Sequence, residues 1–316
     1  MTDTQRVPAA QPTTSAIHQA VPAHVAAALV QNDVPYTAPV EGLLHLGDPR
    51  EDEAEQRRAA LGIGQEHVAE LARMARDQAL YHDDMEANEV WGPLHALQLL
   101  KTLDSSSVAV GLVPLLDIED DWYDTLLPDL FGNAGPLVFE PLRAYLRDRT
   151  RWQYGHATAG DALVKLVEQH ADLREEAVAT LLELIEDSSS GPELRAFMIS
   201  DLADLKAVEA LPAIRRAFEA DQIDLSIMGG WGDVQEAFGL TPDLEDALVA
   251  ETEQRRIERH AEMFPFLQGV QPVDGQIPTI SAGTTPRAKP GEQARKKKHK
   301  RKQEAASRKA NRRKRK

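Results

Sequence analysis

The chain has 316 residues, no cysteine and 5% aromatic residues, and its 51 acidic side chains outnumber its 36 lysines and arginines. Without cysteine, disulfide frameworks, thiol catalysis, iron–sulfur clusters and cysteine zinc sites are excluded. No apolar run approaches the roughly 18–20 residues of a membrane span, and no apolar stretch follows a basic start at the N-terminus. We therefore expect a cytoplasmic protein that does not bind a membrane.

The charge is divided between an acidic body and a basic tail. Residues 287–316 contain 16 lysines and arginines and 2 glutamates, which give this segment a net charge of +14. The upstream residues keep 20 basic and 49 acidic side chains, a net charge of −29. The formal charge of −15 for the whole chain hides this division.

The N-terminal quarter predicts a leader followed by helices. Residues 1–22 are rich in Thr, Ala, Pro and Gln, and they are predicted to be disordered because they offer too little apolar surface to offset the entropy of ordering. Residues 23–90 are predicted to form an N-terminal helical extension, with helices over 23–30 and 67–82 built from good helix formers. The acid-rich stretch 48–58 is expected to be a loop or a short exposed helix.

From residue 91 onward, pairs of predicted helices recur. Apolar positions of the first helices align at Leu97, Leu127, Leu163 and Ile199, in steps of 30, 36 and 36 residues. This period predicts an all-α fold, an α-solenoid of about four helical hairpins that bury their apolar faces against one another. An irregular all-α domain with a chance spacing is the alternative. The first helices are expected at 91–100, 124–131, 158–170 and 193–205, and the second helices at 108–116, 135–146, 174–185 and 207–220.

The second helices support the same pattern and carry a family resemblance. Aligning Val138, Val178 and Leu211 gives two unequal steps, of which the first is the longer. The segments WGPLHALQLL, RWQYGHATAGD and AVEALPAIRRAFEA resemble HEAT-type repeats of the PBS-lyase kind, and a bacterial family of HEAT-like proteins of unknown function. The resemblance covers about residues 85–240. It implies an α-solenoid that binds partners, and it implies no reaction.

One more helix is predicted to close the repeat domain, which we place at residues 91–269. Thr241 is a favourable N-cap, and Pro242 suits the first helical position, so the helix is expected to begin there. Its thin apolar face is typical of a polar cap. Residues 270–293 have the Gly, Pro, Thr and Gln content of a flexible linker.

The basic tail, residues 294–316, is the strongest functional signal. A block of like charges does not fold alone, yet it can displace counterions from a polyphosphate. No aromatic residue lies among these charges, so phosphate contacts to RNA, ribosomes or DNA are expected, with nuclear or nucleoid association possible. A solubilising tail, or a tail that docks on the acidic body as an autoinhibited switch, is the alternative. The candidate nucleic-acid-binding residues are Arg295, Lys296, Lys297, Lys298, Lys300, Arg301, Lys302, Arg308, Lys309, Arg312, Arg313, Lys314, Arg315 and Lys316.

The segment 81–95 raises the possibility of an enzyme. It gathers His82, Asp83, Asp84 and His95, and an alternative function is therefore a metal-dependent hydrolase that uses the His82/Asp83 region. No supporting motif supplies further ligands, and a solvated surface explains the acids more simply. No phosphate-binding glycine loop occurs. We expect a non-enzymatic protein with no catalytic residue, no metal and no cofactor, and a protein partner bound through the solenoid.

Three tryptophans recur at nearly the same period. Trp91, Trp122 and Trp152 stand at almost equal intervals along the chain and form a candidate groove for a peptide, although packing between repeats is the alternative. Trp231 stands in a Gly-rich turn.

The acidic body is expected to repel duplex DNA unless its few basic residues gather on one face. These basic residues include Arg143, Arg147, Arg149 and Arg151.

Overall fold

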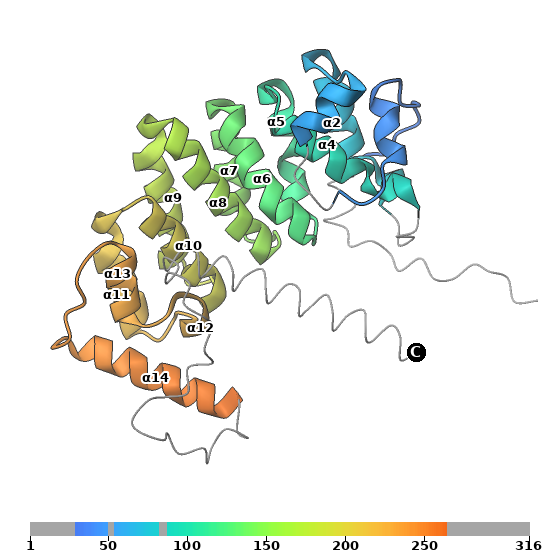
Figure 1. Cartoon of the computed structure of the whole chain (residues 1–316). Coiled ribbons are helices and arrows are strands. Elements are labelled where there is room, and N and C mark those ends of the chain that lie inside the picture. Colours follow the sequence, from blue (N-terminus) through green and yellow to red (C-terminus); the bar gives the residue numbers. More distant parts are fainter. Residues whose placement is uncertain (1–28, 50–53, 82–86, 264–316) are drawn as a thin grey trace, which may run out of the picture.

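The computed structural model describes residues 29–49, 54–81 and 87–263, which are mainly α-helices and short 3-10 helices joined by turns (Figure 1). These residues contain no strand, and one isolated parallel bridge pairs Val30 with Asp77. The predicted all-α class is confirmed for this part of the chain. None of its helices is long and apolar enough to cross a membrane.

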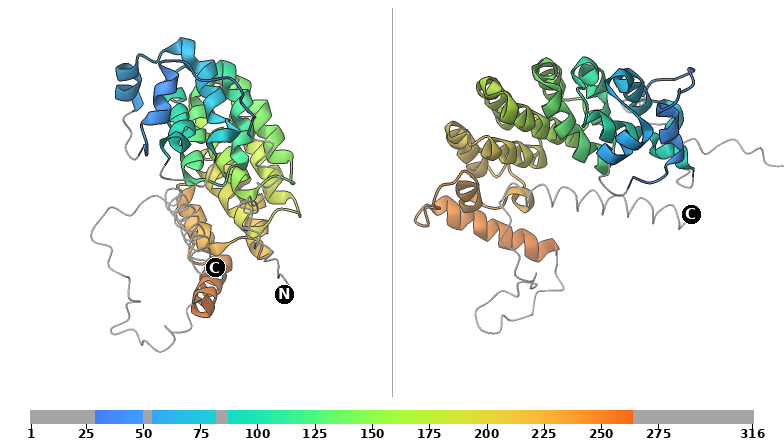
Figure 2. Two further views of the ribbon diagram at one scale, coloured as in Figure 1. Left: turned by 90° about the vertical axis from the view of Figure 1, so that its right-hand side faces the viewer. Right: turned by 45° about the horizontal axis from the view of Figure 1, so that its top comes forward.

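The helices between residues 92 and 219 alternate between two rows, seen side by side in Figures 1 and 2. In the first row, α4 packs on α6, α6 on α8 and α8 on α10. In the second row, α7 packs on α9 and α9 on α11, while each of α5, α7 and α9 also contacts the next first-row helix. All eight helices predicted between residues 91 and 220 are present. The first row is α4 (Gly92–Leu100), α6 (Asp121–Ala134), α8 (Gln153–Gln169) and α10 (Pro192–Asp204), and the second row is α5 (Ser106–Leu112), α7 (Phe139–Arg147), α9 (Arg174–Glu186) and α11 (Leu211–Glu219).

Helices at both ends extend the two rows. At the N-terminal end, α2 (Ala54–Leu61) contacts α4, and α3 (Val68–Ala75) contacts α4 and α5. At the other end, α12 (Leu225–Met228) and α13 (Trp231–Ala237) contact α10, and α14 (Ala247–Met263) contacts α11, α12 and α13. The stack is therefore longer than the four hairpins that the period predicts.

The spacing of the helices is more regular than the alignment of apolar residues. The second-row helices α7, α9 and α11 begin 35 and 37 residues apart, and the first-row helices end 34, 35 and 35 residues apart. The unequal steps predicted from Val138, Val178 and Leu211 are wrong. A 3-10 turn precedes each of these helices, and Val138, Leu173 and Ala210 end the three turns, so Leu173 and Ala210 are the true equivalents of Val138.

One apolar core runs through the stack. Leu97, Leu127, Leu163 and Ile199, the positions that revealed the period, are all fully buried. In the first row, α6 and α8 approach each other closely where Gly132 faces α8, because a Cβ there would lie 2.8 Å from the Cβ of Lys165. The missing side chain thus allows the two helices to meet.

The predicted helix over 67–82 is interrupted after Ala75. Asp77 ends it, because its carboxylate accepts hydrogen bonds from Asn32 at 2.9 Å, from Tyr36 at 2.6 Å and from the backbone N–H of Ala79 at 3.0 Å. A short 3-10 helix, η3 (Gln78–Leu80), follows. Of the helix predicted over 23–30, only residues 29 and 30 are described, and they are not helical.

The predicted start of the last helix is also wrong: α14 begins at Ala247, not at Thr241. Asp246 takes the capping position, since its carboxylate accepts the backbone N–H of Leu248 at 3.1 Å and forms an ion pair with Arg215 of α11. It also accepts a hydrogen bond from the Trp231 indole at 3.2 Å. These partners from distant segments outweigh the local preference of Thr241 and Pro242.

Two arginines fasten α14 to the turn that follows α11. Asp221 accepts hydrogen bonds from Arg255 at 3.0 Å and from Arg259 at 2.8 Å. Asp221 itself has a positive φ of 52°, which places its carboxylate at the tip of this turn.

The predicted Gly-rich turn at Trp231 is in fact the start of α13. Trp231 is 4% exposed, and the centroid of its ring lies 5.8 Å from that of Phe218.

Candidate interaction surfaces

The strongest sequence signals lie outside the described residues. The basic tail, residues 294–316, belongs to this part, as do His82 and Asp83. In the part of the chain that the structure describes, no group of three or more His, Asp or Glu side chains could hold a metal ion. His95, the remaining candidate of that segment, is buried in α4 and its Nε2 lies 2.7 Å from the carbonyl oxygen of Gly47.

The three tryptophans of the candidate groove lie at the starts of successive first-row helices. Trp91 precedes α4 as its N-cap, Trp122 is the second residue of α6, and Trp152 is the N-cap of α8. Trp122 is 38% exposed, whereas Trp91 and Trp152 are half-buried. Trp152 packs against Tyr154, with ring centroids 5.4 Å apart. The structure therefore brings all three to one edge of the first row, partly packed and partly exposed.

Acidic residues share this edge with the tryptophans. Asp120 caps α6 by accepting the backbone N–H of Trp122 at 2.8 Å, and Asp121 lies in the same first turn. Glu89 and Glu193 occupy the first turns of η4 (Asn88–Trp91) and α10. Carboxylates at helix N-termini stabilise the helix, so these acidic residues also have a local structural role. Together with the rings they give this edge an acidic and aromatic character.

The four arginines considered for DNA binding are all engaged in ion pairs. Two of them belong to α7 and two to the turn that follows it, and their partners come from α7, from α9 and the residue that follows α9, and from two further aspartates. Such pairs neutralise the guanidinium groups and orient them toward protein carboxylates. The body therefore does not present these arginines as a free cationic face. The pairs are Arg143 with Glu140 and Glu176, Arg147 with Glu183, Arg149 with Asp187, and Arg151 with Asp117 and Asp148.

The same kind of pairing continues along the second row. Arg174 of α9 binds Glu209 at 2.7 Å, and Arg216 of α11 binds Glu186 of α9 at 2.9 Å. The hydrogen bond from Arg147 lowers the pKa of Glu183. Exposed pairs of this kind each contribute roughly 0–1 kcal/mol. Their main effect is to set the register between neighbouring helices.

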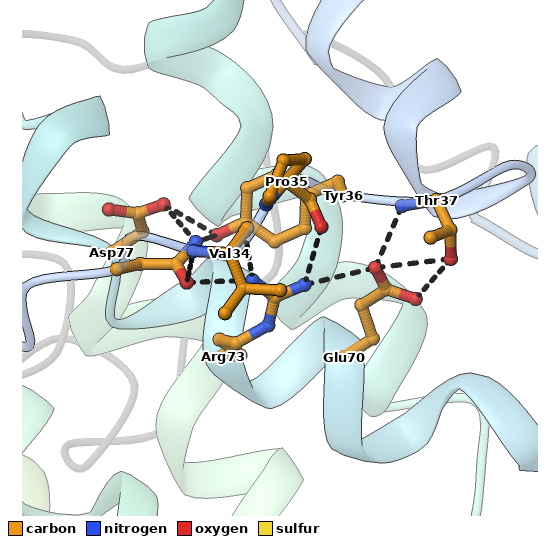
Figure 3. Close-up of polar contacts among 8 residues, drawn as sticks. Val34, Pro35, Tyr36, Thr37, Glu70, Arg73 and Asp77 are labelled. Carbon is orange, nitrogen blue, oxygen red and sulfur yellow. Dashed lines mark hydrogen bonds and ion pairs between the residues drawn. The ribbon is translucent and has the colours of Figure 1, made fainter.

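An extended segment, residues 32–37, lies across α3 and is held by two side chains of this helix and by Asp77, which follows it (Figure 3). We call these six residues the strap. Arg73 donates to the carbonyl oxygen of Val34 at 2.5 Å, and Glu70 accepts the backbone N–H of Thr37 at 2.9 Å. Asp77 accepts the Tyr36 hydroxyl, and burial together with this hydrogen bond raises the pKa of Tyr36. Helix α3 thus binds a stretch of extended backbone.

Sequence reasoning missed the strap because its partners lie far away in the chain. Glu70, Arg73 and Asp77 are spaced by three and four residues, which would place them on one face of the helix predicted over 67–82. That spacing was the available signal. It does not reveal that the face contacts residues about 40 positions upstream.

Two recesses open on the described surface. An open, polar recess of about 580 Å³ gathers the ends of α4, α6 and α8 against the start of α2, with Lys101, Asp129 and Lys165 in its wall. A second recess of about 380 Å³ lies between α3 and α5, beside the strap. The first mixes positive and negative side chains, so it selects no ligand charge.

In comparisons with known proteins, no family model matches this chain, and no curated protein and no solved structure matches it significantly. The resemblance to HEAT-type repeats therefore rests on the sequence motifs alone.

Proposed function

We propose that this protein is a non-enzymatic interaction protein, an α-solenoid of HEAT-like hairpins whose acidic body binds a protein partner and whose basic tail binds RNA, ribosomes or DNA. The observation that carries the proposal is the division of charge, +14 over residues 287–316 against −29 upstream. A tail of this density binds phosphates through counterion release and without sequence preference. An acidic body does not compete for the same phosphates.

Two features support the solenoid reading. The second-row helices recur every 35 and 37 residues, and each first-row helix packs on the next one. A stack of this kind exposes long edges and faces instead of one enclosed cavity, which suits extended partners. This period is shorter than the roughly 40–47 residues of the common HEAT form, so the HEAT-like part of the proposal rests on the sequence motifs.

The ion pairs of the body support the assignment of phosphate binding to the tail. Arg143, Arg147, Arg149 and Arg151 already bind carboxylates. A phosphate would have to displace these partners at a cost, whereas the sequence of the tail holds one acidic side chain, Glu304, for 14 lysines and arginines. For the protein partner, the edge with Trp91, Trp122 and Trp152 is the candidate, because exposed aromatic rings serve as anchors in interfaces.

The test is polyanion binding across a salt series. Full-length protein is compared with a truncation that ends at Pro286, using single-stranded RNA and duplex DNA. We expect the full chain to bind with log K falling linearly against log salt, since slopes are about −0.9 per phosphate contact on B-DNA and about −0.7 on single strands. The truncation should not bind. Equal binding by both proteins would move phosphate recognition to the body and sink the proposal.

A matched pair of variants sharpens the test. The tail carries two basic clusters, residues 295–302 and 308–316, with seven lysines and arginines each. Replacing the seven of one cluster with glutamine should reduce the salt slope by about half, whichever cluster is chosen. A slope that depends on only one cluster would indicate a specific site. If the full chain fails to bind but the truncation gains affinity for a protein partner, the tail docks on the body and the autoinhibited switch is correct.

A further inference from the structure

Trp91 and Trp122 stand in register at the starts of two neighbouring helices, α4 and α6. At the other ends of these helices, the Asn133 side chain donates to the carbonyl oxygen of Lys101 at 3.3 Å, and Lys101 forms an ion pair with Asp129 at 3.7 Å. The two helices therefore run parallel. Trp91 lies 10 residues before Lys101, and Trp122 lies 11 residues before Asn133. The tryptophans thus differ by one residue, or about 1.5 Å, along the helix axes.

This register fixes the spacing of the two side chains and leaves one of them open to solvent. Axes of packed helices lie about 8–10 Å apart, so the two tryptophans leave their helices at about that distance. Trp122 is 38% exposed and is the only aromatic residue among the exposed large apolar residues of the described part. Trp91 is half-buried. An exposed indole at a helix start is an available anchor for a partner.

Three acids lie within three residues of the two tryptophans along the chain. They are Glu89, Glu119 and Asp121, of which the first two are exposed. Among the residues that the structure describes, none makes an ion pair or a hydrogen bond with these three side chains. Residues 87–93 and 118–125 contain no lysine or arginine. We call the two tryptophans and these three acids the acidic tryptophan edge.

We propose that the acidic tryptophan edge binds an extended segment of the protein partner with arginine at every third residue. This inference rests on the proposed function, because it names the chemistry of the partner that the body binds. The charge of the edge selects a cationic segment. Arginine suits it best, since a guanidinium can lie over an indole ring and pair with a carboxylate at the same time.

The spacing of the tryptophans selects the conformation of the partner. In a polyproline II segment, side chains three residues apart point in the same direction and lie about 9.3 Å apart. This distance matches the separation of two packed helices. Two successive arginines of such a segment can therefore each reach one tryptophan. In a β-strand the side chains on one face recur at about 6.6 Å, which does not match.

The test is the binding of labelled nine-residue peptides to full-length protein, measured by fluorescence anisotropy. The first peptide has arginine at every third position among proline and glutamine. The second has the same composition with its three arginines adjacent, and in the third and fourth glutamate or glutamine replaces arginine. We expect the first peptide to bind best, the second to bind several-fold more weakly, and the other two not to bind.

Protein variants locate the site. Trp122→Ala should weaken binding of the first peptide on the order of tenfold, because the exposed ring is the anchor. Glu89→Gln and Asp121→Asn should each weaken it by up to about fivefold, as expected for solvent-exposed ion pairs. The matched controls are exposed second-row positions, Leu137→Ala and Glu175→Gln, which should leave binding unchanged. The far-UV circular dichroism of each variant checks that the helices are retained.

The other outcomes separate this inference from the proposed function. If the first peptide binds Trp122→Ala protein as well as the natural protein, the edge is not its site and the inference is wrong. If the neutral peptide binds in a way that depends on Trp122, the edge binds a protein partner of another chemistry, so the inference fails and the proposed function stands. If no peptide binds, the inference fails together with the assignment of the edge to a protein partner.

The chain's own basic tail is the competing occupant. A full-length variant in which glutamine replaces the fourteen lysines and arginines of residues 295–302 and 308–316 removes this competitor and leaves the described residues unchanged. We expect the first peptide to bind this variant and the natural protein alike. Binding to the variant alone would show that the tail fills the edge, and would overturn the assignment to an external partner.

Discussion

The carboxylate of Asp117, which is completely buried, accepts a hydrogen bond from the Tyr145 hydroxyl at 2.7 Å. Arg151 donates to the other oxygen of the same carboxylate, also at 2.7 Å. Asp117 ends η5 (Val113–Asp117), just after α5, while its two donors come from α7 and from the turn before α8. Burial, followed by the bond to Asp117, raises the pKa of Tyr145. One buried acid therefore joins three consecutive parts of the stack.

Removing this acid should destabilise the protein strongly. Asp117→Ala leaves a buried hydroxyl and a half-buried guanidinium without their acceptor. We expect a loss of about 2–4 kcal/mol in the free energy of unfolding. This value is near the lower end for a broken buried pair, because the Arg151 side chain reaches solvent. Urea denaturation measures this loss. The control, Asp172→Ala in an exposed 3-10 turn, should change stability by less than about 0.5 kcal/mol. Equal effects would show that the carboxylate is not a structural link.

Gly132→Ala should destabilise the protein although alanine is the better helix former. In an exposed helix this change stabilises by roughly 1 kcal/mol. Here the new Cβ would stand 2.8 Å from the Cβ of Lys165 and 3.2 Å from its backbone carbonyl carbon. Overpacking of this kind costs about 1–3 kcal/mol. Ala179→Gly, at an exposed position of α9, reports the ordinary difference between the two residues. A Gly132→Ala protein with a higher melting temperature would disprove the close contact.

His95 should make the protein less stable as the pH falls from about 6.5 to 4. Its Nε2 donates to the carbonyl oxygen of Gly47, while the buried Nδ1 has no hydrogen-bond partner among the described residues, so the cation is disfavoured. Burial lowers the pKa of His95 from 6.5 to about 4, and Arg57 adds to this while Asp48 opposes it.

The sign follows from proton uptake. Between pH 6.5 and 4 the unfolded chain binds a proton at this residue and the folded chain does not, so acid favours unfolding by at most roughly 3 kcal/mol. Above pH 6.5 the residue contributes no pH dependence. His95→Gln should flatten the stability curve in this window. His45→Gln, at an exposed position, should leave the curve unchanged, and the same slope in both variants would contradict the assignment.

The two arginines of α7 should differ in their effect on stability. Arg143 binds Glu140, Glu176 and the Thr180 hydroxyl, and its side chain is mostly buried, whereas Arg147 is exposed and binds only Glu183 among the described residues. We expect Arg143→Ala to cost about 1–2 kcal/mol and Arg147→Ala less than about 1 kcal/mol. Double-mutant cycles with Glu176→Ala and Glu183→Ala measure the coupling. A larger coupling for Arg147 would reverse the ranking.

The helices were predictable because their signals are local. Apolar residues at helical spacing located α4 to α11, and positions such as Leu97 and Leu163 are indeed in the core. The start of α14 was not predictable in this way. Asp246 caps this helix in place of Thr241, because Arg215 and Trp231 bind the Asp246 carboxylate. These two residues lie 31 and 15 positions away in the chain.

The interaction surfaces were less accessible from the sequence. The spacing of Trp91, Trp122 and Trp152 raised a candidate groove, and the structure places the three at the starts of successive first-row helices. The strap and the recess between α3 and α5 depend on contacts between residues about 40 positions apart, for which no pattern in the sequence gives the pairing. The arginine pairs across α7 and α9 depend on the register of the stack in the same way.

The fastening of α14 has a mechanical consequence. Residues 264–316 follow α14 in the chain, so a force transmitted along the backbone from the tail reaches the described residues at the end of this helix. Asp221 holds Arg255 and Arg259, one turn apart, and thereby resists both sliding and peeling of the helix. A force applied to the tail is passed by the contacts of Asp221 with Arg255 and Arg259 to the turn after α11, and then along the second row.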